Sequence, residues 1–216
     1  MHDVLRRVAI GDLTPEDAPS EFADRYDTEI FNTTKPETMD AVYTDCLTFL
    51  AEYNYQYLDE YEVVAAEDHL EFEVEGVKMH GYIDLLLRDK DGNYIVMDYK
   101  SCKPFYGKRG NLLKAMQSTY EEYLKQMCLY CIAVEQNYGK TPTKVMWLHF
   151  RHQAMTEHDV SREEIEATKK WVKDVTDRIK NDKVFPPCKD WFRCTNICDY
   201  RHTCEYLLFD DEEEGD

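Results

Sequence analysis

The chain has 216 residues, a formal net charge of −18 and a hydrophobic content of 43%. This length suits one domain with a small appendage. No apolar run approaches the roughly 20 residues that cross a bilayer, and the first ten residues lack a signal-peptide pattern. We therefore expect a cytoplasmic protein without membrane partners, in a microbe or a virus-infected host cell. The acidity argues against a general nucleic-acid binder, since phosphate neutralisation needs lysine and arginine.

The charge is distributed unevenly along the chain. Residues 210–216 (DDEEEGD) contribute −6 and have the composition of a solvated tail. In contrast, residues 99–114 (YKSCKPFYGKRGNLLK) contain five basic residues and no acid. An acidic protein with one local basic segment can still hold DNA at a cleft.

Helical patterns dominate the first 60 residues, which we expect to form an N-terminal helical region. One helix is predicted over 2–10, ending at Gly11. A second follows Thr14, a residue type favoured as N-cap, with Pro15 at the first helical position. Apolar residues at three- and four-residue spacing predict a third helix over 36–53.

The pattern changes to that of strands after Tyr61. We expect four of them, over residues 62–66, 70–75, 77–88 and 93–99. The alternation in LEFEVE predicts one solvated face, whereas the nearly continuous apolar runs in YIDLLL and YIVMDY predict central strands. Asp91-Gly92 is a strong signal for a hairpin turn between the last two strands.

Three further elements complete the predicted α/β fold. They are a helix over 115–138, a strand over 143–150 and a helix from Ser161 to about residue 181, where Ser161 and Glu164 form a capping box. The order of elements predicts a mixed central sheet flanked by helices, with a core over 61–184. A cysteine-rich metal-binding segment is expected over 185–207 and an acidic tail over 208–216.

Two aspartates and a lysine in the central hairpin carry the chemical prediction. Asp84 and Asp98 lie equally far from Asp91, so pairing around that residue places them opposite each other. Cross-strand partners have Cβ atoms about 4.5–5.5 Å apart. Lys100 is two residues past Asp98 and therefore projects from the same face of its strand.

Two carboxylates at this separation repel each other unless a cation lies between them or one holds a proton. Oxygen ligands so placed suit Mg²⁺ or Mn²⁺, and a nearby ammonium can help to deprotonate a water and to stabilise charge on phosphate. Phosphodiester hydrolysis requires these groups. The alternative to a catalytic role is a structural Asp–Lys pair at a sheet edge. The predicted geometry also depends on the register, since a slip of one residue would move one acid to the other face of the sheet.

The motifs around these residues resemble those of a nuclease family. GYID at 81–84 and MDYKS at 97–101 resemble the G-x-x-D and D/E-x-K motifs of PD-(D/E)XK nucleases, and Gln126 with Tyr130 matches Q-x-x-x-Y of the RecB-like branch. That branch includes the AddB nuclease and CRISPR-associated and phage exonucleases. The resemblance runs from His2 to Cys204 and implies a restriction-endonuclease-like core.

The resemblance also implies roles for individual residues. The divalent metal would be held by the side chains of His2, Asp84 and Asp98 and the carbonyl of Tyr99. Lys100 would be the catalytic lysine, while Gln126 and Tyr130 would position the substrate.

The implied histidine ligand lies at the extreme N-terminus, whereas relatives carry a further segment before this helix. Terminal residues fray unless they are held by the fold. His69 and His80 precede the GYID motif and are the alternative ligands, and His80 is expected to share the face of Asp84 on its strand.

Four cysteines lie close together near the C-terminus, at 188, 194, 198 and 204. In an intracellular protein such a cluster favours metal ligation over disulfides. The spacing from Cys194 resembles the C-x2-C-x5-C tail that holds a [4Fe-4S] cluster in RecB-like nucleases, with Cys188 replacing their distant fourth cysteine. Four thiolates also suit Zn²⁺, so both metals remain open. Either would pin the C-terminal segment as a structural staple.

The main hypothesis is therefore a metal-dependent DNA nuclease, a RecB-like exodeoxyribonuclease. It would act on DNA ends or single strands in recombination, repair or replication of a phage or microbial genome, alongside other recombination or replication proteins. The second hypothesis is a catalytically idle nuclease-fold subunit that binds DNA or, in keeping with its acidity, a protein. The third is a zinc-stapled interaction domain whose acids are structural.

Overall fold

A computed structural model describes residues 1–29, 36–187, 190–196, 198–201 and 203–206, with side chains except at 27–29, 36–38, 192 and 196. The contacts divide the chain into two compact units, Met1–Val175 and Thr176–Asp216. Within the described residues, no helix combines the length and the apolar character that crossing a bilayer requires.

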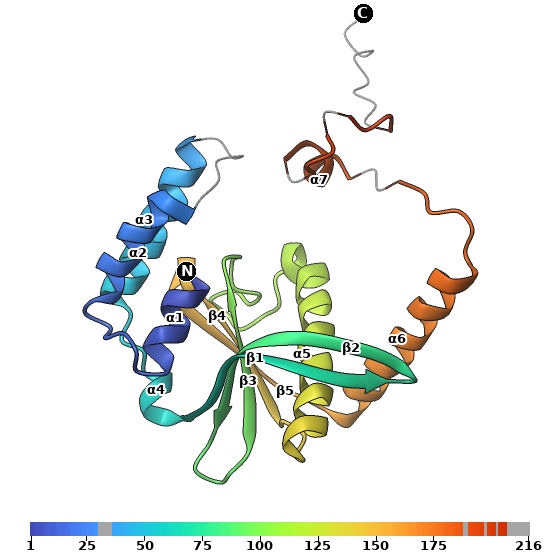
Figure 1. Cartoon of the computed structure of the whole chain (residues 1–216), viewed down its shortest axis with the longest axis horizontal. Helices are drawn as coiled ribbons and strands as arrows, with labels where there is room; N and C mark the ends of the chain where they lie inside the picture. The colour runs from blue at the N-terminus through green and yellow to red at the C-terminus, as the bar shows by residue number, and fades with distance from the viewer. Residues whose placement is uncertain (30–35, 188–189, 197, 202, 207–216) are drawn as a thin grey trace, which may run out of the picture. The chain divides into compact units, whose positions relative to one another are not determined.

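The first unit is built on one five-stranded sheet in the order β1-β2-β3-β4-β5 (Figure 1). The strands are β1 Glu62–Val74, β2 Val77–Arg88, β3 Tyr94–Lys100, β4 Lys144–His149 and β5 Ala154–Asp159. Neighbouring strands are antiparallel, except that β3 and β4 are parallel. A parallel pair needs a long crossover, which α5 provides. The mixed sheet flanked by helices confirms the predicted architecture.

The helices of the first unit are α1 His2–Ala9, α2 Ala18–Glu29, α3 Pro36–Glu52, α4 Tyr57–Glu60, α5 Gln117–Tyr138 and α6 Arg162–Asn181, the last of which ends in the second unit. Two short 3-10 helices occur at Lys114–Met116 and Phe150–His152, and the second unit contains α7, Trp191–Asn196. The helix expected after Thr14 begins later, because Thr14 instead caps a turn by accepting a 3.2 Å hydrogen bond from Asp17 N.

Each face of the sheet has its own hydrophobic core. Leu85, Leu87 and Met97 point towards the buried residues of α1, α2 and α3. Leu86 and Val96 point the other way, towards α5 and the start of α6. Because both faces of the sheet are covered here, residues 85–87 and 95–99 are buried, as the apolar runs predict. The first half of β2 is more exposed, and Tyr82 is 60% exposed.

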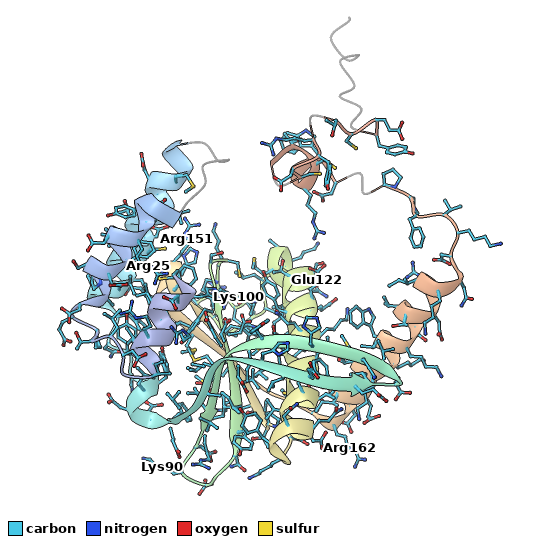
Figure 2. The ribbon with its side chains drawn as sticks, viewed as in Figure 1. Arg25, Lys90, Lys100, Glu122, Arg151 and Arg162 are labelled. Carbon is cyan, nitrogen blue, oxygen red and sulfur yellow. The ribbon has the colours of Figure 1, made fainter. Side chains whose placement is uncertain are left out.

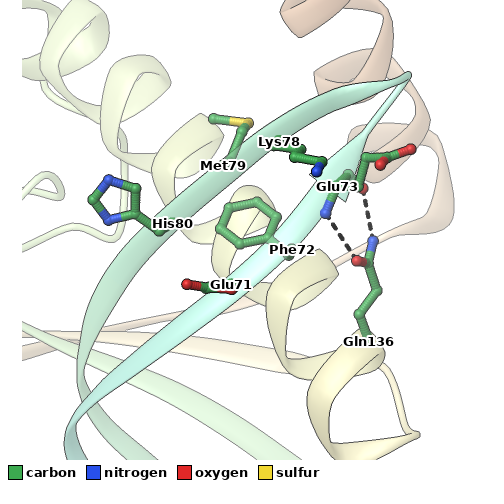
Figure 3. Close-up of a pocket in the computed structure, with 7 residues that line it drawn as sticks. All are labelled: Glu71, Phe72, Glu73, Lys78, Met79, His80 and Gln136. Atoms are coloured by element: carbon green, nitrogen blue, oxygen red, sulfur yellow. Dashed lines mark hydrogen bonds between the residues drawn. The ribbon is translucent and has the colours of Figure 1, made fainter.

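The β1–β2 hairpin is longer than expected. The predicted strands over 62–66 and 70–75 are one continuous strand, so that prediction was wrong. The polar stretch between them stays paired with β2. Glu67 lies in this stretch with a φ of 49°, and the register of the pairing shifts between Val63 and Ala65. The far end of the hairpin is tied to α5, since the amide of Gln136 accepts from Glu73 N at 2.9 Å and donates to Glu73 O at 2.8 Å (Figure 3).

The predicted capping box at the start of α6 is confirmed. Glu164 N donates to Ser161 Oγ at 3.2 Å, and Glu164 Oε2 accepts from Ser161 N at 2.8 Å. Both bonds satisfy amides that the helix itself leaves unpaired.

We predict that Ser161→Ala lowers the free energy of unfolding by about 1 kcal/mol, since the cap is lost while the fold is unchanged. Urea denaturation followed by circular dichroism measures this. Ser118→Ala, at an exposed position in α5, is the matched control and should change stability by less than about 0.5 kcal/mol. Equal effects of the two substitutions would contradict the capping role.

Candidate active site

The β2–β3 hairpin forms in the predicted register. Leu85 pairs with Met97, and Arg88 pairs with Tyr94 next to the turn. Asp84 and Asp98 are the next residues beyond the last pair, at the point where β2 leaves β3 and continues beside β1 alone (Figure 1). We call this point the fork. It places the two aspartates on facing strand segments where the pairing of β2 with β3 ends.

At the fork, a carboxylate replaces a main-chain hydrogen-bond acceptor. Tyr99 N donates to Asp84 Oδ2 at 2.8 Å. On the other side of Asp84, strand β1 is distorted at Glu67, whose φ of 49° lies in the left-handed region. Asp84 thus compensates for a lost sheet hydrogen bond, and this bond fixes its side chain beside β3.

Asp98 is a buried acid, with only 4% of its surface exposed. Lys100 Nζ lies 2.6 Å from Asp98 Oδ2, although this oxygen accepts no well-aligned hydrogen bond from any described residue. Burial raises the pKa of Asp98 to about 6, Lys100 opposes that rise, and the charge of Asp84 adds to it. Asp98 is therefore held next to a cation and a second acid in a place where an anion is poorly solvated.

Lys100 is held by contacts with α5 as well as by Asp98. Its ammonium donates to Gln126 Oε1 at 3.2 Å and lies 4.2 Å from the centre of the Tyr123 ring. Gln126 Nε2 in turn donates to the hydroxyl of Tyr130 at 2.9 Å. A continuous polar chain thus joins Asp98 to Tyr130 and brings the predicted positioning residues next to the predicted lysine. In Figure 2, Lys100 lies to the left of the upper part of α5.

Tyr123 is a contact of Lys100 that the sequence motifs did not single out. It lies three residues before Gln126 on α5 and therefore on the same helical face. That spacing is the signal that could have found it.

His2 reaches the fork from the opposite face of the sheet. Its Nδ1 lies 3.4 Å from Asp84 Oδ1, and its ring meets the edge of the Tyr99 ring at 5.8 Å. The hydrogen bond with Asp84 raises the pKa of His2 against the effect of burial. The helix is held by the buried side chains of Val4, Leu5 and Val8, so α1 presents His2 to the fork.

The alternative histidines lie elsewhere on the sheet. His69 Nε2 is 3.4 Å from His80 Nδ1, and the His69 ring packs against Tyr82 at 4.8 Å. The expectation that His80 shares the face of Asp84 assumed regular alternation, which fails between them. Ile83 packs in the core under α5, whereas Leu85 packs in the other core. Of the three histidines, it is His2 that contacts Asp84.

The fork offers donors that suit a hard cation, namely two carboxylates, an imidazole and the carbonyl of Tyr99. Across the described part of the chain, no three His, Cys, Asp or Glu side chains converge into a preformed metal group. Asp84 is instead engaged by His2 and the Tyr99 amide, and Asp98 by Lys100. The residue types fit a divalent metal. Because Asp98 and Asp84 repel each other, a cation bound between them would be stabilised.

Of the predicted cysteine ligands, the structure describes three. Cys194, Cys198 and Cys204 are each half-buried in the second unit. Cys188 lies outside the described residues.

The buried acid predicts an unusual dependence of stability on pH. The pKa of folded Asp98 is about 6, above its ordinary value of 3.8, so between these values the folded chain keeps a proton that the unfolded chain releases. Stability therefore falls as pH rises from about 4 to about 6. We predict that Asp98→Asn stabilises metal-free protein above pH 7 by up to about 3 kcal/mol, with no gain at pH 3.5.

Urea denaturation in EDTA at the two pH values measures the difference. Asp91→Asn, at the exposed hairpin turn, is the matched control and should show no such difference. An Asp98→Asn protein that is less stable than wild type at pH 8 would contradict the burial argument.

Comparison with known proteins agrees with this geometry. No curated protein sequence matches the chain. A crystal structure of a candidate exonuclease from Eubacterium rectale is similar in fold, with 14% sequence identity and a TM-score of 0.51 over 94% of this chain and 81% of that one. The family model of the PD-(D/E)XK nuclease superfamily matches residues 1–205. The chain belongs to the PD-(D/E)XK nuclease superfamily.

Proposed function

We propose that this chain is a metal-dependent DNA nuclease whose active site is the fork, with Asp84, Asp98 and Lys100 as its catalytic residues. The observation that carries the proposal is the buried Asp98–Lys100 pair, 2.6 Å apart, beside Asp84. Burying an ion pair gains little stability over apolar packing. Such a pair on a central strand is therefore better explained by chemistry than by folding.

His2, Asp84, Asp98 and the Tyr99 carbonyl are the residues that would hold Mg²⁺ or Mn²⁺. When bound, such a cation supplies Lewis acidity to the phosphate. The two carboxylates would exchange their present partners for the cation, which relieves the poor solvation of Asp98. His2 would complete the donor set from the other face of the sheet.

Lys100 would bring positive charge to the phosphate as negative charge develops there. Gln126 orients its ammonium by the 3.2 Å hydrogen bond, and Tyr130 orients Gln126 in turn. Because a correctly placed charge acts only if it is held in place, this chain from α5 would make Gln126 and Tyr130 positioning residues.

The narrower function is an exodeoxyribonuclease of the RecB-like kind, acting on DNA ends or single strands. The Q-x-x-x-Y pair beside Lys100 supports this branch, and the candidate exonuclease with a similar fold is consistent with it. From the same resemblance we propose that the enzyme acts in recombination, repair or replication of a phage or microbial genome. It would work in the cytoplasm with other proteins of those processes. The alternative of an idle scaffold subunit is supported by the net charge of −18. The presence of all three catalytic groups favours the enzyme.

We predict that Lys100→Met lowers kcat by at least about 100-fold, because the charge at the phosphate is lost. Asp98→Asn and Asp84→Asn should reduce cleavage to background. End-labelled single- and double-stranded DNA, incubated with Mg²⁺ or Mn²⁺, reports the rates.

Lys90→Met and Asp91→Asn are the matched controls, since both residues are exposed on the β2–β3 turn, at the other end of the hairpin from Lys100 (Figure 2). They should cleave at the wild-type rate. Wild-type rates in Lys100→Met and both aspartate variants would favour the scaffold alternative.

We also propose that Cys188, Cys194, Cys198 and Cys204 hold a [4Fe-4S] cluster, with Zn²⁺ as the alternative, as a staple of the C-terminal segment. Anaerobically purified protein should be brown with a broad absorbance at about 400 nm. Cys198→Ala should lose the metal, measured by elemental analysis, whereas Cys102→Ala should keep it. Colourless protein with one zinc per chain would select the alternative, and no metal in either form would reject both.

A further inference from the structure

A small hairpin follows Lys100 directly in the chain. Leu113 N donates to Phe105 O at 2.9 Å, Gly107 N donates to Asn111 O at 2.9 Å, and a β-bridge joins Tyr106 with Leu112. We call it the 105–113 hairpin. Its tip is a turn closed by Gly110 N donating to Gly107 O at 2.9 Å, with Gly110 at φ 73°. Lys108 and Arg109 occupy the two central positions of that turn.

The base of the 105–113 hairpin is anchored in the core. Phe105 is completely buried, with its ring centre 5.2 Å from Trp147 and 4.8 Å from His149. His149 lies beside Lys100 in the sheet register, and its Nδ1 is 3.0 Å from the carbonyl of Cys102. The segment between Lys100 and Phe105 is therefore tied to the strand next to the fork, and the base of the hairpin is fixed relative to the active site.

The tip carries two uncompensated positive charges in a strongly acidic chain. Lys108 and Arg109 are exposed, and no carboxylate of a described residue forms an ion pair with either. Of the other arginines of the first unit, Arg6, Arg7, Arg25, Arg88 and Arg151 have carboxylate partners, whereas Arg162 has none among the described residues. With 44 acidic against 26 basic residues, two adjacent unpaired cations are unexpected unless a partner from outside the chain neutralises them.

The distance from the active site suits a contact on the same nucleic-acid molecule. Lys108 is eight positions after Lys100 in the sequence, and eight residue steps span at most about 28 Å. At a rise of about 3.4 Å per nucleotide in duplex DNA, this is the length of no more than about eight nucleotides. The tip is therefore close enough to the fork to contact the same strand as Lys100.

We propose that the 105–113 hairpin is a phosphate-binding element, in which Lys108 and Arg109 bind the nucleic-acid backbone beside the scissile phosphate. The inference rests on the proposed nuclease function for the identity of the ligand. Lysine and arginine are the side chains that neutralise phosphates. Since the tip does not touch the reacting phosphate, it contributes to binding and register and leaves the chemical step to Lys100.

The test is the salt dependence of DNA binding by the full-length protein, in EDTA so that the DNA stays intact. Fluorescence anisotropy with a labelled single-stranded oligonucleotide, and with its duplex, gives the affinity over a range of NaCl concentrations. For Lys108→Gln/Arg109→Gln we expect weaker binding. The slope of log K against log[NaCl] should fall by about 1.4 on the single strand, which corresponds to two lost phosphate contacts.

Lys78→Gln/Lys90→Gln removes the same charge from exposed positions near two other hairpin turns and is the matched control. It should leave the slope unchanged. Both double variants should unfold at the wild-type temperature, because all four positions are exposed. An unchanged slope for the tip variant on both DNA forms, or a loss no larger than that of the control, would overturn the proposal.

Kinetics separate a failure of this inference from a failure of the nuclease proposal. If the chain cleaves DNA, the tip variant should have a raised KM and a kcat within about twofold of wild type. Cleavage with an unchanged KM and an unchanged salt slope would reject the hairpin and keep the nuclease. A tip-dependent salt slope in a chain that never cleaves would reject the nuclease and support the hairpin as a DNA contact.

Discussion

The buried Asp98–Lys100 pair is the constraint on which the rest of the site depends. A carboxylate with 4% exposure loses most of its hydration, and the nearby Asp84 makes its charge still less favourable. One ammonium at 2.6 Å opposes both effects without cancelling them, so turning Lys100 away would leave the charge of Asp98 isolated and still less favourable. The contacts of Lys100 with Gln126 and Tyr123 then fix the face of α5 that borders the site. A single ion pair thereby links the central strand to the helix that covers it.

The fork explains how side chains from both layers reach this pair. Next to the β2–β3 turn the two strands are covered on both faces, but at Asp84 their hydrogen bonding ends and a side chain takes over as acceptor for Tyr99 N. The divergence of the strands opens the site between the two cores, so α1 approaches from one face with His2 and α5 from the other with Gln126. Functional groups from both layers meet where the sheet is interrupted. Assembly of the site thus requires the regular pairing of β2 with β3 to end at this point.

The hairpin register could be predicted because it depends on local information, the Asp91-Gly92 turn and two apolar runs, and Leu85–Met97 confirms it. The neighbourhood of Lys100, Gln126 and Tyr130 followed from motif spacing on strand and helix.

Strand β5 was missed because AMTEHD is short and polar and pairs with β4 alone. The break at Glu67 was taken for a strand end, since a non-glycine residue with positive φ has no clear signature in sequence. The role of His149 depends on a tertiary contact with Cys102, which no periodicity reveals.

The acidity of the chain and a nucleic-acid substrate are compatible once distance is considered. At physiological ionic strength the Debye length is about 8 Å, so exposed carboxylates farther than this from a bound phosphate repel it only weakly. Under the proposed function, what matters is the charge close to the path of the strand, which Lys100 would supply at the fork and Lys108 and Arg109 at the tip of the 105–113 hairpin. Few contacts imply modest affinity, and a modest affinity suits an enzyme that must release each product. Under the proposed function, net acidity would disfavour binding of DNA elsewhere on the molecule and would favour binding at the fork.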